Sequence, residues 1–421
     1  MERFQAVQPA PFARTRHPGA QWFPGASFGL FMHWGIHCVA GLDPSWAMKT
    51  SIPWYTGEDA EAYRGKANYY ALAPRFNPER YDPGLWIAAA RRAGIQYAVL
   101  TAKHHDGYCL WPSSYGSMNT RTYMGGRDLL GPFITACHNH GIKAGLYFSG
   151  PDWSYPGFPV NMDEARKSGS QSLEQTFDDQ DFQHYVHGQL SELLTRYGKL
   201  DLIWFDGGVG EFDKTCAWIR ELQPHIVIGR KGDIDQSFES GHKPLEPPAG
   251  WWETVMYLGG HWGHAPATEI ERAPLILDKL VNTRAWGGNF LMNLGPRPDG
   301  TMRPEFYQRL EEIAAWMDHS RPSVIGADAV GNWQNFSAVP ITRRENVWYL
   351  HVLPTLFGPI QMYDVRERPV SVTLLRTGQS LVHRYYSNRL VVDLPYSQRG
   401  KLDEVVEVRF EREPHPARLR Y

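Results

Sequence analysis

Cysteine is scarce in this chain of 421 residues, which has only four: Cys38, Cys109, Cys137 and Cys216. They lie far apart beside apolar runs, and no two form a C-x-x-C pair. This spacing favours neither a zinc site nor a disulfide framework. We therefore expect four buried free thiols in a reducing compartment.

Long apolar runs and an excess of one charge are missing as well. The N-terminal residues have no apolar core of signal-peptide length, and no stretch is long enough to span a membrane. The 43 basic residues nearly balance the 45 acidic ones, for a net charge of −2, and they form no basic stripe. We therefore expect a cytoplasmic protein that binds neither membrane nor nucleic acid. The sequence leaves a homo-oligomer open.

Aromatic residues, by contrast, are abundant, with 16 tryptophans and 21 tyrosines. Flat rings that carry a polar group suit the faces of sugars, but they also suit large hydrophobic cores. The chain is longer than one hydrophobic core usually supports, so it is expected to form two domains.

The first 300 residues alternate between expected strands and expected helices. This alternation predicts a parallel sheet with crossover helices, either a (β/α)8-like TIM barrel or, as the alternative, an open doubly wound sheet. No G-x-G-x-x-G segment opens a helix after a strand, which weakens a dinucleotide-binding version of the open sheet. The seven expected strands span residues 28–34, 97–103, 143–149, 202–206, 226–229, 251–256 and 290–294.

The pattern changes near residue 320. From there the chain has short alternating runs, such as VWYLHVL and EVVEVRF, separated by Gly, Pro and Asn. This spacing predicts an antiparallel β-sandwich. We therefore expect an α/β barrel domain with an N-terminal arm over residues 1–319 and a C-terminal β-sandwich domain over residues 320–421.

Polar residues follow the expected strands at positions where a core would exclude them. His33 follows the first strand, His104 and His105 follow the second, and Asp206 and Arg230 end later ones. In a parallel barrel these strand ends share one mouth. A lone histidine is more often structural, but such a group at neighbouring strand ends indicates a functional site.

Two carboxylates of the barrel suggest nucleophilic and acid–base chemistry. Asp206 ends the segment LIWFDGG, and Glu253 lies in the expected strand 251–256 directly after two tryptophans. Attack on an anomeric carbon needs one ionised carboxylate, which Arg230 or a histidine would favour for Asp206. An apolar wall would raise the pKa of Glu253 toward that of a general acid.

A metal site is the competing use of the segment HHD. Adjacent histidines of a strand point to opposite faces, unlike the i, i+4 pair of H-E-x-x-H on a helix. We therefore expect neither a metal nor another cofactor.

Several long segments resemble the α-L-fucosidases of glycoside hydrolase family 29. The resemblance rests on FGLFMHWG, on the run from RFNPERYDPGLW to KHHDGYCLWPS, on LIWFDGG, on WWET and on GGNFLMNLGPRPDG. It covers residues 20–320 in the same order. It implies a (β/α)8-like barrel, a C-terminal β-sandwich and a retaining, exo-acting glycosidase.

The resemblance also implies roles for individual residues. The aspartate of the family's WFDG motif is the nucleophile, which falls on Asp206. The glutamate of the WET segment, Glu253, matches the general acid/base of one branch, with Glu211, Glu239 and Glu246 as weaker candidates. The family's sugar-binding positions fall on His33, Trp34, Trp46, His104, His105, Tyr147 and Arg230.

Two departures from the family pattern bear on the substrate. Ser45 stands where many relatives have a glutamate, and Phe148 stands where a second tyrosine is common. The first departure favours the branch that uses Glu253, and it leaves substrate preference open.

The sequence thus predicts a retaining exo-acting α-L-fucosidase that hydrolyses terminal α-L-fucosyl residues of oligosaccharides or glycosides by double displacement. The alternatives are an α-L-galactosidase of the same family, a non-catalytic fucose-binding barrel and a metal-dependent hydrolase.

Overall fold

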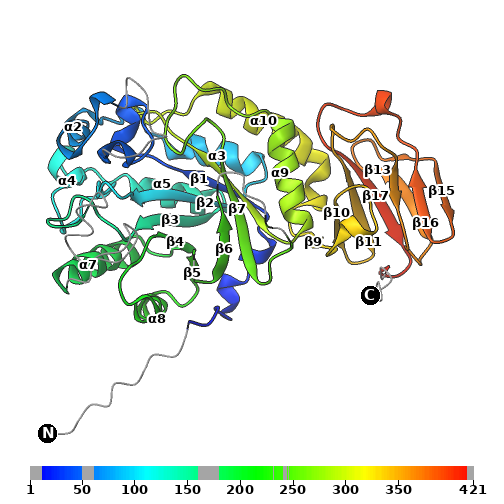
Figure 1. The fold of residues 1–421 in the computed structure, drawn as a ribbon, viewed down its shortest axis with the longest axis horizontal. Helices are drawn as coiled ribbons and strands as arrows, with labels where there is room; N and C mark the ends of the chain where they lie inside the picture. The colour runs from blue at the N-terminus through cyan, green and yellow to red at the C-terminus, as the bar shows by residue number, and fades with distance from the viewer. Residues whose placement is uncertain are drawn as a thin grey trace, which may run out of the picture.

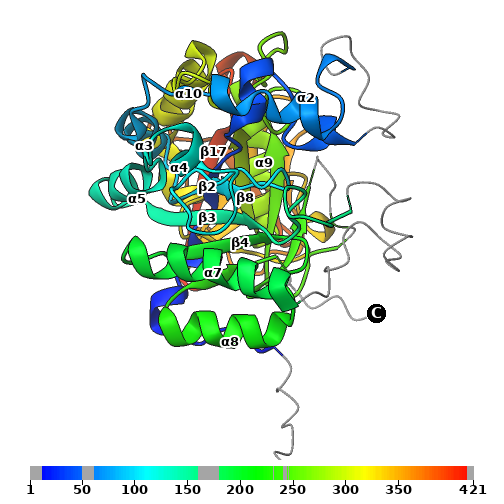
Figure 2. The ribbon, with the colours of Figure 1, turned by 90° about the vertical axis from the view of Figure 1, so that its left-hand side faces the viewer.

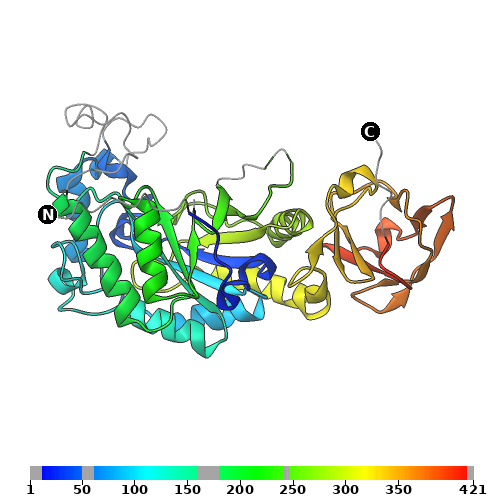
Figure 3. The ribbon, with the colours of Figure 1, turned by 90° about the horizontal axis from the view of Figure 1, so that it is seen from below.

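The computed structural model describes residues 12–49, 61–159, 180–230, 232–239, 244 and 246–414. Two bodies lie side by side, a barrel and a smaller all-β body (Figure 1). Helix α10 (Pro304–Ser320) leads from the barrel to the all-β body, as seen from below in Figure 3.

Eight parallel strands form the barrel, in the order β5-β4-β3-β2-β1-β8-β7-β6. The predicted α/β fold with a (β/α)8-like barrel is therefore confirmed, although the sheet is nearly rather than fully closed. The strands are β1 (Phe28–Met32), β2 (Tyr97–Lys103), β3 (Lys143–Ser149), β4 (Leu202–Asp206), β5 (Val227–Gly229), β6 (Ile234–Phe238), β7 (Trp251–Tyr257) and β8 (Asn289–Leu294).

The strand β6 has no counterpart among the seven expected strands. Its sequence, IDQSF, is short and mostly polar, and of its residues only Ile234 is buried. It stands at one end of the sheet order and β5 at the other, so the barrel opens between them. Asp233 bridges this opening, because its carboxylate accepts the N–H of Ile228 at 2.8 Å and its own N–H donates to the carbonyl of Ile228 at 2.7 Å.

Helices cover the outer face of the barrel. Figure 2 shows α7 and α8 side by side outside β3 and β4. The sequence predicts helices near residues 83–93, 128–140, 181–197, 214–223 and 270–284, and all five are confirmed with ends shifted by a few residues. The larger helices are α3 (Pro83–Arg92), α5 (Leu130–Asn139), α7 (Gln180–Arg196), α8 (Phe212–Leu222) and α9 (Ala273–Ala285); the shorter α2 (Lys66–Tyr70) and α4 (Thr120–Tyr123) lie in loops.

Strand residues alternate between two hydrophobic layers. One set, including Phe31, Tyr97, Tyr147 and Trp204, fills the barrel interior with aromatic rings. The other set packs outward against the helices in the largest core of the molecule. The interior is therefore a packed core rather than a pore.

The C-terminal body contains two antiparallel sheets with their own core around Trp348. The short alternating runs VWYLHVL, VSVTLL, RLVVDL and EVVEVRF each contain a strand, as expected, and the sandwich prediction is confirmed. One sheet contains β9 (Asp328–Ala329), β10 (Ile341–Arg344), β11 (Val347–Val352), β13 (Pro369–Leu374), β14 (Gln379–Ser380) and β17 (Glu404–Phe410); the other contains β12 (Ile360–Met362), β15 (His383–Tyr386) and β16 (Arg389–Val392).

The four cysteines are free and buried, as the sequence predicts. Among the described helices, none combines the length and the apolar character that a membrane crossing requires. The cytoplasmic location stays a prediction.

Candidate active site

Asp206 is the last residue of β4, and its side chain lies at the mouth of the barrel. The residues before it are buried, whereas its own side chain keeps 23 % of its surface exposed. Gly207 takes a φ of +74°, and a Cβ there would meet the ring of Pro151 at 2.4 Å. Glycine therefore permits the turn that leaves Asp206 facing the mouth.

Three side chains hold the Asp206 carboxylate. The Tyr147 hydroxyl donates to Oδ2 at 2.8 Å, Arg230 Nη1 donates to Oδ1 at 2.6 Å, and His105 Nε2 lies 3.5 Å from Oδ2. Burial by itself would raise the pKa of Asp206, but His105, Arg230 and the Tyr147 hydroxyl outweigh it, so that the pKa is lowered. The group is an ionised carboxylate at neutral pH, as a nucleophile requires.

Three histidine rings line the same mouth. His104 and His105 lie 4.3 Å apart between ring centres, and the ring of His33 lies 5.7 Å from that of His104. The expectation that the adjacent histidines point to opposite faces is wrong, because both follow the end of β2 at Lys103, where strand alternation no longer applies.

Each of these rings is oriented by a hydrogen bond at Nδ1. The Nδ1 atom of His33 lies 2.7 Å from the side-chain oxygen of Asn293. The Nδ1 atoms of His104 and His105 each lie 2.6 Å from a hydroxyl oxygen, that of Ser45 and that of Ser149 respectively. Burial lowers the pKa of His33 to about 4, lowers that of His104 well below its usual value, and lowers that of His105. Three neutral imidazoles can each donate or accept one hydrogen bond toward hydroxyl groups.

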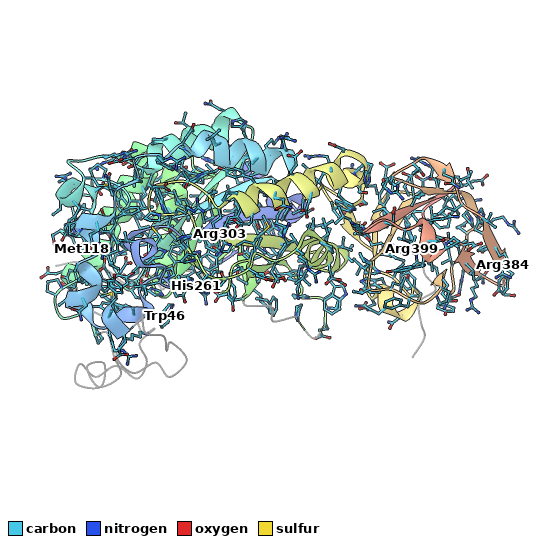
Figure 4. All side chains as sticks on the ribbon, turned by 90° about the horizontal axis from the view of Figure 1, so that it is seen from above. Trp46, Met118, His261, Arg303, Arg384 and Arg399 are labelled. Atoms are coloured by element: carbon cyan, nitrogen blue, oxygen red, sulfur yellow. The ribbon has the colours of Figure 1, made fainter. Side chains whose placement is uncertain are left out.

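Two tryptophans and a lysine form one side of the mouth. Trp46, in a short turn (Trp46–Met48), meets the rings of His105 and Trp153 edge-on, at 5.9 and 5.7 Å. The Lys49 ammonium lies 4.2 Å from the Trp46 ring centre and 4.6 Å from that of Trp153. Figure 4 labels Trp46 in the barrel part of the molecule, on the side away from Arg384 of the sandwich.

Trp34 lies outside this group, and its assignment to the sugar site needs correction. It follows His33 directly, but its side chain lies on the other side of the chain, as its contacts show. Its ring packs against Phe76, Tyr81 and Trp86, and its indole N–H donates to the carbonyl of Arg297 at 3.0 Å. Trp34 is therefore part of the packing between barrel and helices.

Ser45 is a positioning residue. Its hydroxyl contacts His104 Nδ1 and also accepts the backbone N–H of Asp106 at 2.8 Å. The Tyr69 hydroxyl accepts the N–H of Ser45 at 2.8 Å and donates to Asp106 at 2.7 Å. This network sets the orientation of the His104 ring.

The structure places Glu253 inside the barrel rather than at its mouth. The residue is 0 % exposed, and its Oε1 accepts from the Trp204 indole at 2.7 Å and from Ser237 at 2.9 Å, while Oε2 accepts from Tyr97 at 3.2 Å. Trp204 and Asp206 are alternate residues of β4 on the same face. The Trp204 ring therefore lies on the Glu253 side of Asp206, in the packed interior.

Another glutamate lies beside Asp206. Glu239 directly follows β6, and its Oε1 is 3.0 Å from Arg230 Nη1, the nitrogen that also binds Asp206. Its side chain is 33 % exposed. The other two candidates are exposed. Glu211 stands at the N-cap position of α8 and forms an exposed ion pair with Lys214, and the side chain of Glu246 is exposed to solvent.

Several residues that shape the site were not predicted. Asn293 comes from β8, and Trp262 stands in a loop with its ring 5.1 Å from that of His33. Beneath the histidines, Lys103 forms a fully buried ion pair with Asp152 at 3.0 Å. A lysine at the end of the apolar run YAVLTAK, together with the acidic Asp152 shortly after the expected strand 143–149, was the signal in the sequence that could have revealed this pair.

His104, His105 and Asp206 could together hold a metal ion, since one ligand atom from each lies within 4.8 Å of the others. The serine bonds at Nδ1 would leave Nε2 as the ligand atom of both rings. However, Arg230 already places a positive charge on Asp206, which opposes binding of a cation. The same three side chains can instead bind the neutral hydroxyl groups of a ligand through hydrogen bonds.

A model of the α-L-fucosidase family matches residues 5–321 of the chain. The chain belongs to the α-L-fucosidase family. The family resemblance of the sequence is thereby confirmed, and the protein is a glycoside hydrolase.

The sequence of the chain is also similar to those of individual α-L-fucosidases. The tissue α-L-fucosidase of Rattus norvegicus is 29 % identical over 369 residues, which cover 79 % of this chain and 76 % of the relative. The human tissue α-L-fucosidase is 29 % identical over 330 residues, with 71 % and 68 % covered.

Solved structures of fucosidases share the fold. α-L-Fucosidase isoenzyme 1 from Paenibacillus thiaminolyticus superposes with a TM-score of 0.79 at 29 % identity, covering 94 % of this chain and 99 % of that one. A Bacteroides thetaiotaomicron α-L-fucosidase trapped as a covalent intermediate with 2-fluoro-fucosyl fluoride superposes with a TM-score of 0.77 at 23 % identity, covering 96 % and 98 %.

Proposed function

We propose that the protein is a retaining exo-acting α-L-fucosidase that removes terminal α-L-fucosyl residues from oligosaccharides or glycosides. The observation that carries this proposal is the Asp206 carboxylate, held ionised by Arg230 and Tyr147 at the mouth of the barrel. The trapped covalent intermediate of the Bacteroides relative supports a covalent route for the family.

In the first step, a carboxylate oxygen of Asp206 bonds to the anomeric carbon while the glycosidic bond breaks, and an acid protonates the departing oxygen. In the second step, the same group takes a proton from water as the water oxygen replaces Asp206. The double inversion retains the configuration at the anomeric carbon.

We propose Glu239, rather than Glu253, as this acid/base. Because the contacts of Arg230 Nη1 with Asp206 Oδ1 and Glu239 Oε1 measure 2.6 and 3.0 Å, these two oxygens lie no more than 5.6 Å apart. Retaining glycosidases separate their carboxyl groups by about 5–5.5 Å. Glu253 has the raised pKa of an acid, caused by burial, but all of its described contacts are inside the barrel.

The remaining residues of the mouth suit a deoxy sugar. The neutral rings of His33, His104 and His105 face the ring hydroxyls, and Trp46 supplies an apolar surface for the methyl group at C5. The buried Trp204 ring closes the site below, which favours a terminal residue over an internal one.

Hydrolysis of an aryl α-L-fucoside by the wild type and by Asp206→Gly tests the proposal. We expect turnover in the wild type, a loss on the order of 10³-fold or more in the variant, and rescue by azide with an inverted fucosyl azide as the product. Unchanged turnover in Asp206→Gly would overturn the role of Asp206.

A further inference from the structure

A second concave site lies on the outside of the barrel, between α9 and the start of the sandwich domain. It encloses about 190 Å³, and we call it the tryptophan pocket. In Figure 1, α9 stands between the barrel strands and β9–β10 of the sandwich. The pocket is lined by Pro244, Trp252, Thr254, Lys279, Asn282, Thr283, Trp286, Trp333 and Gln334.

The pocket is separate from the mouth that contains Asp206. Glu253 points into the barrel, so its neighbours Trp252 and Thr254 point outward through the wall of β7. Trp333 belongs to a short turn (Trp333–Asn335) of the sandwich domain. Both domains therefore contribute side chains to the pocket.

Three tryptophans supply flat apolar walls, and polar groups lie among them. The indole nitrogen of Trp333 is buried and has no hydrogen-bond partner among the described residues. Asn282 uses its amide nitrogen to contact Asp278, which leaves its amide oxygen to accept a bond from a ligand. Lys279 and Gln334 add further donors at the edge.

We propose that the tryptophan pocket is a saccharide-binding site for a hexopyranosyl ring other than the one cleaved at Asp206. Such a ring has an apolar C–H face that stacks on indoles and hydroxyls that pair with the amides of Asn282 and Gln334 and with the Lys279 amine. A purely apolar ligand would use none of these polar groups. The volume is below the roughly 300–1,000 Å³ of pockets for drug-sized ligands, which favours a single ring.

The pocket adjoins the strand that ends next to the active site. The ring of Phe238, the last residue of β6, packs edge-on against Trp252 of the neighbouring strand β7 at 5.9 Å. Glu239 follows Phe238 directly and lies beside Asp206 through Arg230. The pocket itself lies outside the barrel wall, so it binds its ring independently of the residue held at the mouth.

The test is a titration of the full-length protein with lactose and with N-acetyllactosamine, neither of which carries fucose. Binding is followed by calorimetry and by tryptophan fluorescence, with and without saturating L-fucose. We expect saturable binding that L-fucose leaves unchanged and that Asp206→Gly retains. The affinity should fall about tenfold in Trp333→Ala and by a smaller factor in Trp333→Phe and Gln334→Ala.

Phe357→Ala is the matched control, because Phe357 is an 84 % exposed aromatic residue of the same domain that does not line the pocket. It should bind both sugars as the wild type does. Phe357→Ala and the three pocket variants (Trp333→Ala, Trp333→Phe and Gln334→Ala) should keep wild-type kcat/KM on an aryl fucoside, which Asp206→Gly does not. No saturable binding, full displacement by L-fucose, or unchanged binding in both Trp333→Ala and Gln334→Ala would overturn the proposal. Aryl fucoside hydrolysis is measured separately. Absence of sugar binding would therefore contradict the pocket proposal alone, and absence of hydrolysis would contradict the proposed function alone.

Discussion

The carboxylates of Asp206 and Glu239 are bound by one and the same guanidinium nitrogen of Arg230. Arg230 reaches both from a backbone with a φ of +42°, a conformation that costs a non-glycine residue about 1–3 kcal/mol. Its side chain also lies over the Trp204 ring, with 5.3 Å between Cζ and the ring centre. The pairing of the two carboxylates therefore depends on the loop after β5.

Replacement of Glu239 should separate the two steps of the reaction. In Glu239→Gln we expect kcat to fall by about 10²–10⁴ on a fucosylated oligosaccharide, whose leaving group needs protonation, and much less on a dinitrophenyl fucoside. Glu246→Gln, which changes an exposed glutamate of the same region, is the control. Equal rates for Glu239→Gln and the wild type on the oligosaccharide would contradict the assignment.

Replacement of Glu253 should affect stability more than catalysis. In Glu253→Gln the amide oxygen can still accept from Trp204 and Ser237, and the amide N–H can donate to the Tyr97 hydroxyl in place of the bond that Oε2 accepts. The variant should therefore retain most of both activity and stability. Glu253→Ala leaves three buried donors unpaired and should lower the free energy of unfolding by about 2–5 kcal/mol, measured by urea denaturation. A selective loss of kcat in a stably folded Glu253→Gln would return the acid/base role to Glu253.

The acidic limb of the pH–rate profile should report on Asp206. Its pKa is lowered, so the carboxylate stays ionised, and kcat/KM should fall only at pH values below the ordinary range of an aspartic acid. In Arg230→Met the loss of positive charge raises this pKa, and the limb should move to higher pH. Lys214→Met, which removes a cation from the surface of α8, should leave the limb in place. An unshifted limb in Arg230→Met would mean that another group controls it.

The buried pair of Lys103 and Asp152 should be costly to break. Both side chains are 0 % exposed, and Lys103 also donates to Gln189 at 2.9 Å. Lys103→Met leaves an uncompensated buried carboxylate and should lower the free energy of unfolding by about 3–5 kcal/mol. The double variant Lys103→Met/Asp152→Asn should lose less than the sum of the single losses. Strict additivity in the urea titrations would show that the two groups are not coupled.

Chelation should leave the reaction unchanged. His104, His105 and Asp206 are close enough to share an ion, but the proposed steps use only protein groups. We expect the same kcat before and after dialysis against EDTA. A loss that added Zn²⁺ or Mn²⁺ restores would assign these three residues to a metal and would contradict the mechanism.

Much of the molecule was predictable from the sequence because it depends on local patterns. Apolar runs that end at polar residues located seven of the eight barrel strands, and the mouth residues followed from the shared direction of parallel strands. Asp206, His33, His104, His105, Tyr147 and Arg230 do lie together. The strand β6 was missed because, beside the opening of the barrel, IDQSF buries only one of its side chains.

Only the tertiary structure decided which way side chains face and which carboxylates meet. Trp34 and Glu253 stand in or beside strands that lead to the mouth, yet one turns outward and the other lies within the packed interior. Glu239 looked unremarkable in a polar loop, but the turn after β5 brings Arg230 between it and Asp206. The sequence by itself determined the elements and the nucleophile candidate, because periodicity and strand ends are local. The partner of Asp206 was decided by closure of the barrel, which sets distances between residues that the sequence order does not relate.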